Sequence, residues 1–202
     1  MALRRILAAA AVLPLCSCIT IKLAGGSSDH TIYRLECPVP SEAGETGCDI
    51  RVRDFSCASE YDRTGMVLVD SSGVVTRTSG NRWASSPSVA LSDLITRDLV
   101  AEGSFTAVLR RSVMDGSGVI LEGGVREFGA RQSGGVWLAV IDTDLTLFDS
   151  ESGLVIDQRR IELSSPMSST GFPELARAMS GLAAQWSAEA RAFVHDAIGG
   201  AR

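Results

Sequence analysis

Alternating apolar and polar positions in the second half of the chain predict three long strands joined as an antiparallel meander. From Trp137 to Leu147 every second side chain faces one side, whereas Asp142 and Asp144 fall on the other. The connections QSGG and ESG have the length of hairpin loops. One face of the meander is therefore expected to be buried, with a bulge or sharp bend at Gly123-Gly124. The three runs are GVILEGGVREFGAR, GVWLAVIDTDLTLFDS and LVIDQRRIELSSP.

Apolar spacings of three and four residues predict two helices. The first is expected over about residues 88 to 102, after Pro87 and before Gly103. The second begins near Pro173, ends at Gly199-Gly200 and covers about 25 residues. Its apolar stripe, which would lie on the sheet, consists of Phe172, Leu175, Met179, Leu182, Trp186, Ala190, Phe193 and Ala197.

Shorter apolar runs predict the remaining strands. IRVRDF and GMVLVDSSGVVTRTS precede the first helix, the latter split by a Ser-Ser-Gly turn, and FTAVLRR follows that helix. The order along the chain is strands, helix, strand, meander, helix. This order predicts an α+β domain over residues 31–198, built from a single mainly antiparallel sheet with two helices packed on one face.

Residues 1–17 have the features of a secretory signal peptide. Arg4 and Arg5 precede the apolar run ILAAAAVLPL, which is too short to span a bilayer. The stretch resembles a bacterial lipoprotein signal, in which Leu15-Cys16-Ser17-Cys18 places the lipidated residue at Cys18. Lipidation at Cys16 would instead put Leu15 at the cut site. The alternative interpretation is a buried N-terminal helix that carries two incidental cysteines.

An acylated Cys18 would anchor the chain to a membrane, because each buried methylene of an acyl chain contributes about 0.8 kcal/mol. Residues 18–30 would then form a lipidated tether, of which AGGSSDH is the flexible part. The Ile19-Thr20 pair after the cysteine resembles lipoproteins destined for the outer membrane. The expected location is therefore the outer membrane, with the domain facing the periplasm.

The net charge of the chain argues against partners that carry many negative charges. Without residues 1–17 the chain keeps 17 basic and 24 acidic side chains, a formal charge of about −7. This balance argues against a nucleic-acid partner and against a basic patch for anionic lipid headgroups.

Three cysteines remain beyond the tether, in what would be an oxidising compartment. If DIRVRDF is a strand, Cys48 and Cys57 lie at its opposite ends, too far apart for a disulfide. A hairpin around PVPSEAGETG would instead place Cys37 opposite Cys48. The expectation is a Cys37–Cys48 disulfide with Cys57 free, and the alternative is three reduced thiols.

The sequence carries no recognisable catalytic or metal-binding constellation, so we expect neither an enzyme nor a cofactor. The nucleophile elbow, the Walker loop and the zincin motif are missing, and the Cys16-Cys18 pair lacks further metal ligands. His195 is expected to complement the dipole of the last helix. Asp142 and Asp144 could act as paired carboxylates, but cross-strand ion pairs with Arg126 or Arg159-Arg160 are the favoured interpretation.

A family resemblance appears in NRWASSPSVALSDLITRDLVAEGSFTAV, residues 81–108, and in the TIYRLE that follows the lipoprotein signal. Arg82-Trp83, the leucine-bearing helix after it and the Gly-Ser-Phe that follows resemble the ABC-type transport auxiliary lipoprotein family. The resemblance extends over about residues 31–197, including the meander and the last helix. The inserted cysteines depart from the family pattern, as does the absence of an aromatic-rich segment before Arg82.

The resemblance implies a part in lipid transport between the inner and outer membranes, beside an MCE-domain protein and an ABC transporter of the envelope. It also implies that the protein acts by contact with its partners and can form ring-like homo-oligomers. An alternative is another envelope lipoprotein of similar shape, which serves outer-membrane assembly or lipopolysaccharide export.

The Arg82-Trp83 pair is the candidate partner-binding site, because arginine and tryptophan are the side chains that most often anchor interfaces. The alternative is that Trp83 packs back on Leu91 or Leu94 as a hydrophobic staple of the first helix.

Overall fold

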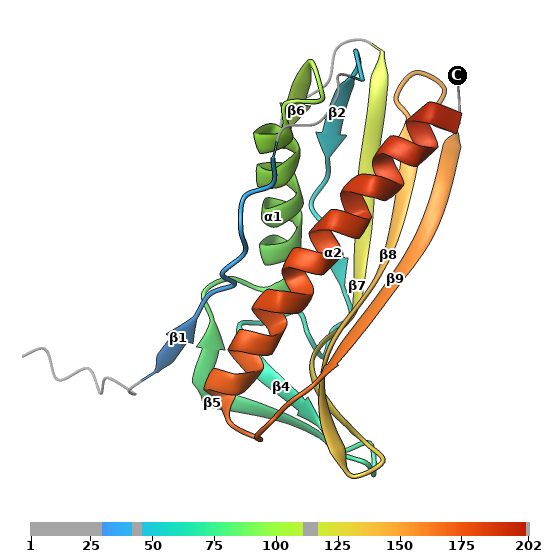
Figure 1. Cartoon of the computed structure of the whole chain (residues 1–202). Helices are drawn as coiled ribbons and strands as arrows, with labels where there is room; N and C mark the ends of the chain where they lie inside the picture. The colour runs from blue at the N-terminus through green and yellow to red at the C-terminus, as the bar shows by residue number, and fades with distance from the viewer. Residues whose placement is uncertain (1–29, 42–45, 111–116, 201–202) are drawn as a thin grey trace, which may run out of the picture.

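The computed structural model describes residues 30–41, 46–110 and 117–200. The predicted signal peptide, Cys18 and nearly all of the tether lie outside these ranges. The described residues form two helices, α1 (Pro87–Glu102) and α2 (Phe172–Gly200), and nine strands. The strands are β1 (Thr31–Tyr33), β2 (Asp49–Val52), β3 (Ser56–Cys57), β4 (Gly65–Val69), β5 (Val75–Trp83), β6 (Ala107–Leu109), β7 (Gly118–Ser133), β8 (Val136–Asp149) and β9 (Val155–Pro166) (Figure 1).

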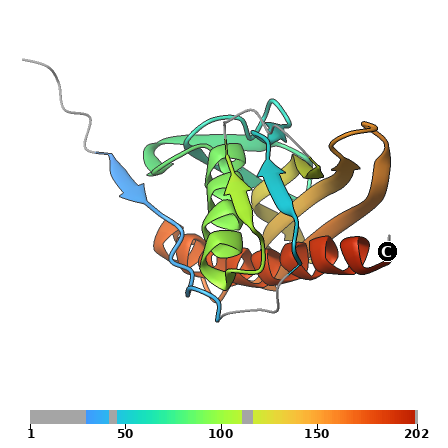
Figure 2. The ribbon, with the colours of Figure 1, turned by 90° about the horizontal axis from the view of Figure 1, so that it is seen from above.

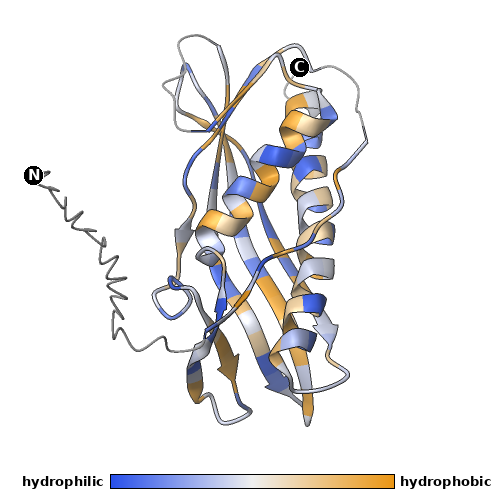
Figure 3. Ribbon diagram, turned by 90° about the vertical axis from the view of Figure 1, so that its left-hand side faces the viewer, coloured by the Kyte–Doolittle hydropathy of each residue, from blue (hydrophilic) through white to orange (hydrophobic). Residues whose placement is uncertain are grey.

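The predicted α+β class is confirmed, with both helices on the same side of one open sheet (Figure 2). The meander is also confirmed: β8 pairs antiparallel with β7 on one edge and with β9 on the other. Hydrophilic and hydrophobic positions alternate along these strands (Figure 3). This alternation gives the sheet one apolar face for the helices.

The sheet is more mixed than the sequence predicts. Along its second edge β7 pairs in turn with β2, β3 and β4, and all three pairings are parallel. The short strand β1 pairs parallel with β5, and β6 pairs parallel with β2. Antiparallel ladders nevertheless supply the longest pairings, which are those within the meander.

The hairpin that would have joined Cys37 to Cys48 does not form, because β1 pairs with β5 whereas β2 pairs with β6 and β7. Cys37, Cys48 and Cys57 are free thiols in the structure. The Cys37 thiol donates a hydrogen bond to the Ser180 carbonyl (3.5 Å), and the Cys48 thiol contacts the Thr46 hydroxyl (3.6 Å). Instead of the expected Cys37–Cys48 disulfide, each of the two thiols has its own polar contact.

The irregularity expected at Gly123-Gly124 lies slightly later, as a register shift between Val125 and Glu127. Gly123 has another role, since the ring of Phe55 occupies the space where a Cβ would stand, within 2.6 Å of it. Phe55 in turn packs edge-to-face on Trp186 of α2, with ring centroids 6.2 Å apart. The glycine thus lets an aromatic side chain lie directly on the strand.

Both helices have the boundaries that their sequences predict. Helix α1 follows Ser86, has Pro87 in its first turn and ends at Gly103, which adopts the left-handed conformation with φ 65°. The apolar stripe of α2 is buried from Leu175 to Ala197. The indole N–H of Trp186 donates to the hydroxyl of Thr143 on β8 (2.8 Å), so the largest side chain of this stripe has its polar atom satisfied in the core.

A polar contact joins the two helices inside this layer. Glu102 of α1, which is 1% exposed, accepts hydrogen bonds from Arg191 of α2 (2.8 Å) and from Ser104 (2.7 Å). The Nε2 of His195 lies 2.7 Å from the same carboxylate. His195 therefore contacts α1 through Glu102, and the expected complement to the dipole of its own helix stays a prediction.

Across the described ranges, neither helix is both long and apolar enough to cross a lipid bilayer.

Candidate functional site

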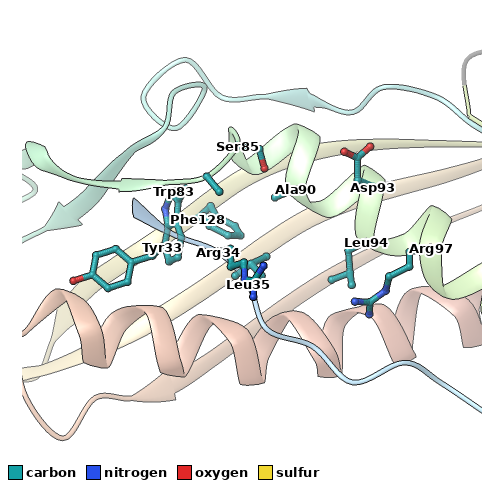
Figure 4. A pocket seen from close by; sticks show the side chains of 11 residues that line it. Tyr33, Arg34, Leu35, Trp83, Ser85, Ala90, Asp93, Leu94, Arg97 and Phe128 are labelled. Atoms are coloured by element: carbon teal, nitrogen blue, oxygen red, sulfur yellow. The ribbon is translucent and has the colours of Figure 1, made fainter. Parts of the chain in front are cut away.

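A pocket of about 240 Å³ lies between β1, the start of α1 and β7 (Figure 4). Its apolar wall is formed by Tyr33, Leu35, Trp83, Leu94 and Phe128, and its rim by Arg34, Ser85, Asp93 and Arg97. Tyr33 and Leu35 belong to the N-terminal segment, Trp83 ends β5, Leu94 lies on α1 and Phe128 on β7. The pocket thus gathers side chains from four separate parts of the sequence.

Trp83, one of the two candidate partner-binding residues, lines this pocket. Its side chain is 4% exposed and packs edge-to-face on Phe128, with ring centroids 5.4 Å apart. Its backbone is fixed by a hydrogen bond from the Trp83 amide to the Thr64 carbonyl (2.7 Å). Its indole Nε1 is buried and has no hydrogen-bond partner in the described part of the chain. A buried donor without a partner is costly, and an acceptor placed in this pocket would remove that cost.

The segment 34–40, which we call the strap, closes one side of the pocket. The guanidinium of Arg97 on α1 donates to the carbonyls of Cys37 (3.2 Å) and Pro38 (3.0 Å). The amide of Glu36 donates to the hydroxyl of Ser180 on α2 (3.1 Å). The strap is therefore held by both helices.

The predicted Arg82-Trp83 pair is split between two sides of β5. Trp83 points into the core beside Leu94, which fits the packing alternative that the sequence left open. Arg82 lines a different hollow, and its Nε donates to the Ser79 carbonyl (3.1 Å). Neighbouring residues of a strand face opposite sides, so these two side chains do not act as one anchor. Partner binding through either residue stays a prediction.

The carboxylates of β8 form ion pairs, as the favoured interpretation expects. Asp142 is only 5% exposed and is bound through both oxygens by Arg160 (2.9 and 2.8 Å), with Arg126 3.4 Å away. Asp144 pairs with Arg126 (3.1 Å). Arg159 has a different partner, Asp196 of α2 (3.6 Å). The paired aspartates are thus neutralised by arginines.

The thiols are poorly suited to nucleophilic chemistry. Burial raises the pKa of Cys57 to about 11, and the nearby carboxylates Asp62 and Glu60 add to the shift. Burial also raises the pKa of Cys37. Since the thiolate is the reactive form, both residues are largely protonated at neutral pH. In the described ranges no three or more histidine, cysteine, aspartate or glutamate side chains gather in a group that could hold a metal ion.

Sequence reasoning missed most of the pocket. The spacing of Tyr33 and Leu35 places them on one face of a strand, and the Leu94 position lies in the apolar stripe of α1, so these carried a detectable signal. Phe128 gave none, because its contact with Trp83 depends on β4, which pairs antiparallel with β5 and parallel with β7.

These features define an α+β protein with a helical layer on one face of an open mixed sheet and a pocket closed by an N-terminal strap. The chain belongs to the family described as the ABC-type transport auxiliary lipoprotein component, whose model matches residues 33–190. This assignment confirms the family resemblance found in the sequence.

Solved structures share the fold. Protein XCC0632 from Xanthomonas campestris, a member of the DUF330 family, is 25% identical with a TM-score of 0.70, over 79% of this chain and 91% of that one. An uncharacterised protein is 17% identical with a TM-score of 0.66, over 82% and 98%. Hypothetical protein CT253 from Chlamydia trachomatis is 11% identical with a TM-score of 0.51, over 75% and 98%. A comparison with curated proteins gives no significant match.

Proposed function

We propose that this protein is a lipid-anchored accessory component of an envelope transport system that moves lipid between the inner and outer membranes. It works beside an MCE-domain protein and an ABC transporter, and it acts by protein contact without turnover. The observation that carries the proposal is the family match over residues 33–190, together with the lipobox cysteine upstream of it. The anchor at Cys18 would hold the domain on the periplasmic side of the outer membrane.

Exposed apolar side chains at one end of the sheet support a role in protein contact. Val74 and Val75 lie at the β4–β5 turn and Val136 at the β7–β8 turn, each more than 40% exposed. Strands β4 and β7 run parallel, so these two turns lie at the same end of the molecule (Figure 1). Apolar side chains gathered at one end are a common feature of protein interaction sites.

Assembly into a ring of copies is part of the proposal. Among the described strands β9 pairs only with β8, so its outer edge offers unpaired backbone groups over Val155–Pro166. Such an edge can pair with a strand of another chain. The mass of the full chain in neutral detergent, measured by light scattering, tests this part.

Crosslinking in native membranes tests the proposed partners. A photoreactive amino acid is placed at Val136, and a second variant carries it at Leu154, which is also exposed but lies at the opposite end of β8. We expect mass spectrometry to identify an MCE-domain protein or a transporter subunit in the Val136 crosslinks. Capture of outer-membrane assembly or lipopolysaccharide-export proteins instead would contradict the proposal and favour the alternative.

A further inference from the structure

A second hollow, of about 470 Å³, lies beside the β4–β5 pair and is lined by three arginines, Arg63, Arg77 and Arg82. Its remaining lining residues are Thr64, Gly65, Thr78 and Ser79, so no carboxylate contributes to it. Arg63 and Arg77 are exposed and Arg82 is half-buried. The hollow therefore combines three positive charges with three hydroxyl groups.

An irregularity in the sheet brings these arginines together. Gly65 pairs with Arg82 and Val67 pairs with Arg77, so Thr78–Asn81 bulge out of β5 opposite Met66 alone. The hydroxyl of Thr78 accepts hydrogen bonds from the amides of Gly80 and Asn81, both at 3.3 Å, which fixes the bulge. Bulges of this kind re-aim side chains and are frequent at functional sites.

The backbone orients two of the guanidinium groups. The Nε of Arg77 donates to the Glu60 carbonyl (3.0 Å), and the Nε of Arg82 donates to the Ser79 carbonyl (3.1 Å). Both bonds use only the inner nitrogen, so the outer nitrogens remain to donate to a ligand. Arginine presents these outer donors in a planar fork that matches the oxygens of a phosphate group.

The absence of ion pairs distinguishes this cluster from most of the other arginines in the described part of the chain. Arg53, Arg97, Arg110, Arg126, Arg131, Arg159, Arg160, Arg177 and Arg191 each form an ion pair. Arg63, Arg77 and Arg82 form no ion pair within the described part of the chain. In a chain with an excess of acidic side chains, three neighbouring unpaired arginines repel one another unless an anion joins them.

We propose that Arg63, Arg77 and Arg82 form a binding site for a phosphate group, and that the group is carried by an anionic lipid headgroup. The phosphate assignment depends on the arginines alone, whereas the choice of a headgroup rests on the proposed lipid anchor. Thr31 and Ile32 of β1 pair with Asn81 and Arg82, so the chain leaves the fold beside the hollow. The stretch from Cys18 to Thr31 can span at most about 45 Å when fully extended. With Cys18 anchored in the membrane, the hollow would therefore stay within about this distance of the lipid headgroups.

This proposal differs from the expectation, drawn from the net charge, that the protein has no basic patch for anionic headgroups. The three arginines are 14 and 5 residues apart in the sequence, within segments of mixed charge. Their convergence depends on the β4–β5 register, which the sequence pattern does not reveal.

Calorimetric titration of the full mature chain in uncharged detergent micelles tests the site. The ligands are inorganic phosphate, micelles doped with phosphatidylglycerol, and micelles doped with diacylglycerol, which lacks the phosphate. We expect phosphate and phosphatidylglycerol to compete for one site, diacylglycerol to have no effect, and added salt to weaken binding. Arg63→Gln, Arg77→Gln and Arg82→Gln should each weaken binding about tenfold, as expected for one charge-assisted contact.

The matched control is Arg53→Gln, which removes the same charge from an exposed arginine paired with Glu122 and should leave binding unchanged. Arg77→Lys should bind with intermediate affinity, because it keeps the charge and loses the fork. Absence of saturable phosphate binding, or an equal loss in Arg53→Gln, would overturn the site. Phosphate binding without competition by phosphatidylglycerol would overturn the headgroup assignment. None of these outcomes depends on the transport partners, so the crosslinking experiment can fail independently.

Discussion

At the scale of single residues, Trp83 has two separate properties. Its ring fills the space beside Phe128, and its indole N–H is buried without a partner. The first property stabilises the fold through buried apolar area, while the second opposes it through the lost hydration of the donor. A substitution that keeps the ring and removes the donor separates the two.

Replacing Trp83 with alanine should lower the free energy of unfolding by about 3 to 5 kcal/mol, because it leaves a large cavity in the core. Trp83→Phe should lower it much less, since phenylalanine retains an aromatic ring against Phe128 and removes the unpaired donor. Chemical denaturation followed by circular dichroism measures both. An equal loss in the two variants would show that the indole N–H has a stabilising partner.

At the scale of secondary-structure elements, Glu102 links α1 to α2. Burial opposes ionisation of this carboxyl, but hydrogen bonds from Arg191, Ser104 and His195 prevail and lower its pKa. A lowered pKa in the folded chain means that the ionised form stabilises the fold. This contribution is complete well above pH 4.5, the ordinary value for glutamate, and is lost as the pH falls through the lowered value.

Glu102→Gln should therefore flatten the decline of stability below about pH 4.5 and should destabilise the fold by about 3 kcal/mol at neutral pH, because it leaves Arg191 without its partner. Thermal melting between about pH 3 and about pH 7, which covers the range in which a glutamate titrates, measures both effects. Glu151→Gln, at the exposed β8–β9 turn, is the charge-matched control. If Glu102→Gln kept the same pH profile of stability as the parent protein, Glu102 would be excluded as the source of the stability loss at low pH.

The contact of Phe55 with Gly123 gives a second prediction at this scale. Gly123→Ala should destabilise the fold by about 1 to 3 kcal/mol, because the new methyl group would overlap the buried ring. Gly80→Ala is the control, since no atom lies within 4 Å of the position of its Cβ. Adding Phe55→Leu to Gly123→Ala should recover part of the loss in denaturant titrations. No recovery would mean that the strain lies in the backbone of β7.

The elements predicted correctly are those that local patterns define. Periodicity located α1, α2 and the meander, and the hairpin loops fixed the neighbours of β8. The pairings predicted wrongly, or missed, join distant segments, such as β1 with β5 and β2 with β6. Parallel pairing requires a crossover and leaves no turn signal in the sequence. The pocket depends on such pairings, and the arginine hollow depends on the irregular register of the β4–β5 hairpin. The sequence therefore indicated single residues of each site and not their neighbours.

At the scale of the whole molecule, the two faces of the sheet differ. The helices cover one face, and the meander carries the pairs of Asp142 with Arg160 and Asp144 with Arg126 on the other. Hydrogen bonds from these arginines satisfy the buried Asp142 and the exposed Asp144, so the second face needs no further protein layer. Proximity of Asp142 raises the pKa of Arg160, which keeps the guanidinium charged.

The proposed attachment to the membrane is a property of the whole chain and depends on one predicted residue, Cys18. Cys18→Ala should move the protein from the membrane fraction to the soluble fraction of the envelope, because the acyl chains would no longer be added. Cys16→Ala should leave the protein in the membrane fraction. Fractionation followed by mass spectrometry of the mature N-terminus measures both. Retention of Cys18→Ala in the membrane, or release of Cys16→Ala, would contradict the assigned lipidation site.

The three-residue pairing of β1 with β5 determines how a mechanical load would enter the domain. A pull on the N-terminal end of the chain reaches β1 first, then the Arg97 contacts with Cys37 and Pro38, and only afterwards the long ladders of the meander. The weakest and strongest parts of the fold are thus in series, with the weakest at the N-terminal end of the described residues. The domain can lengthen by several residues under tension while its core stays intact.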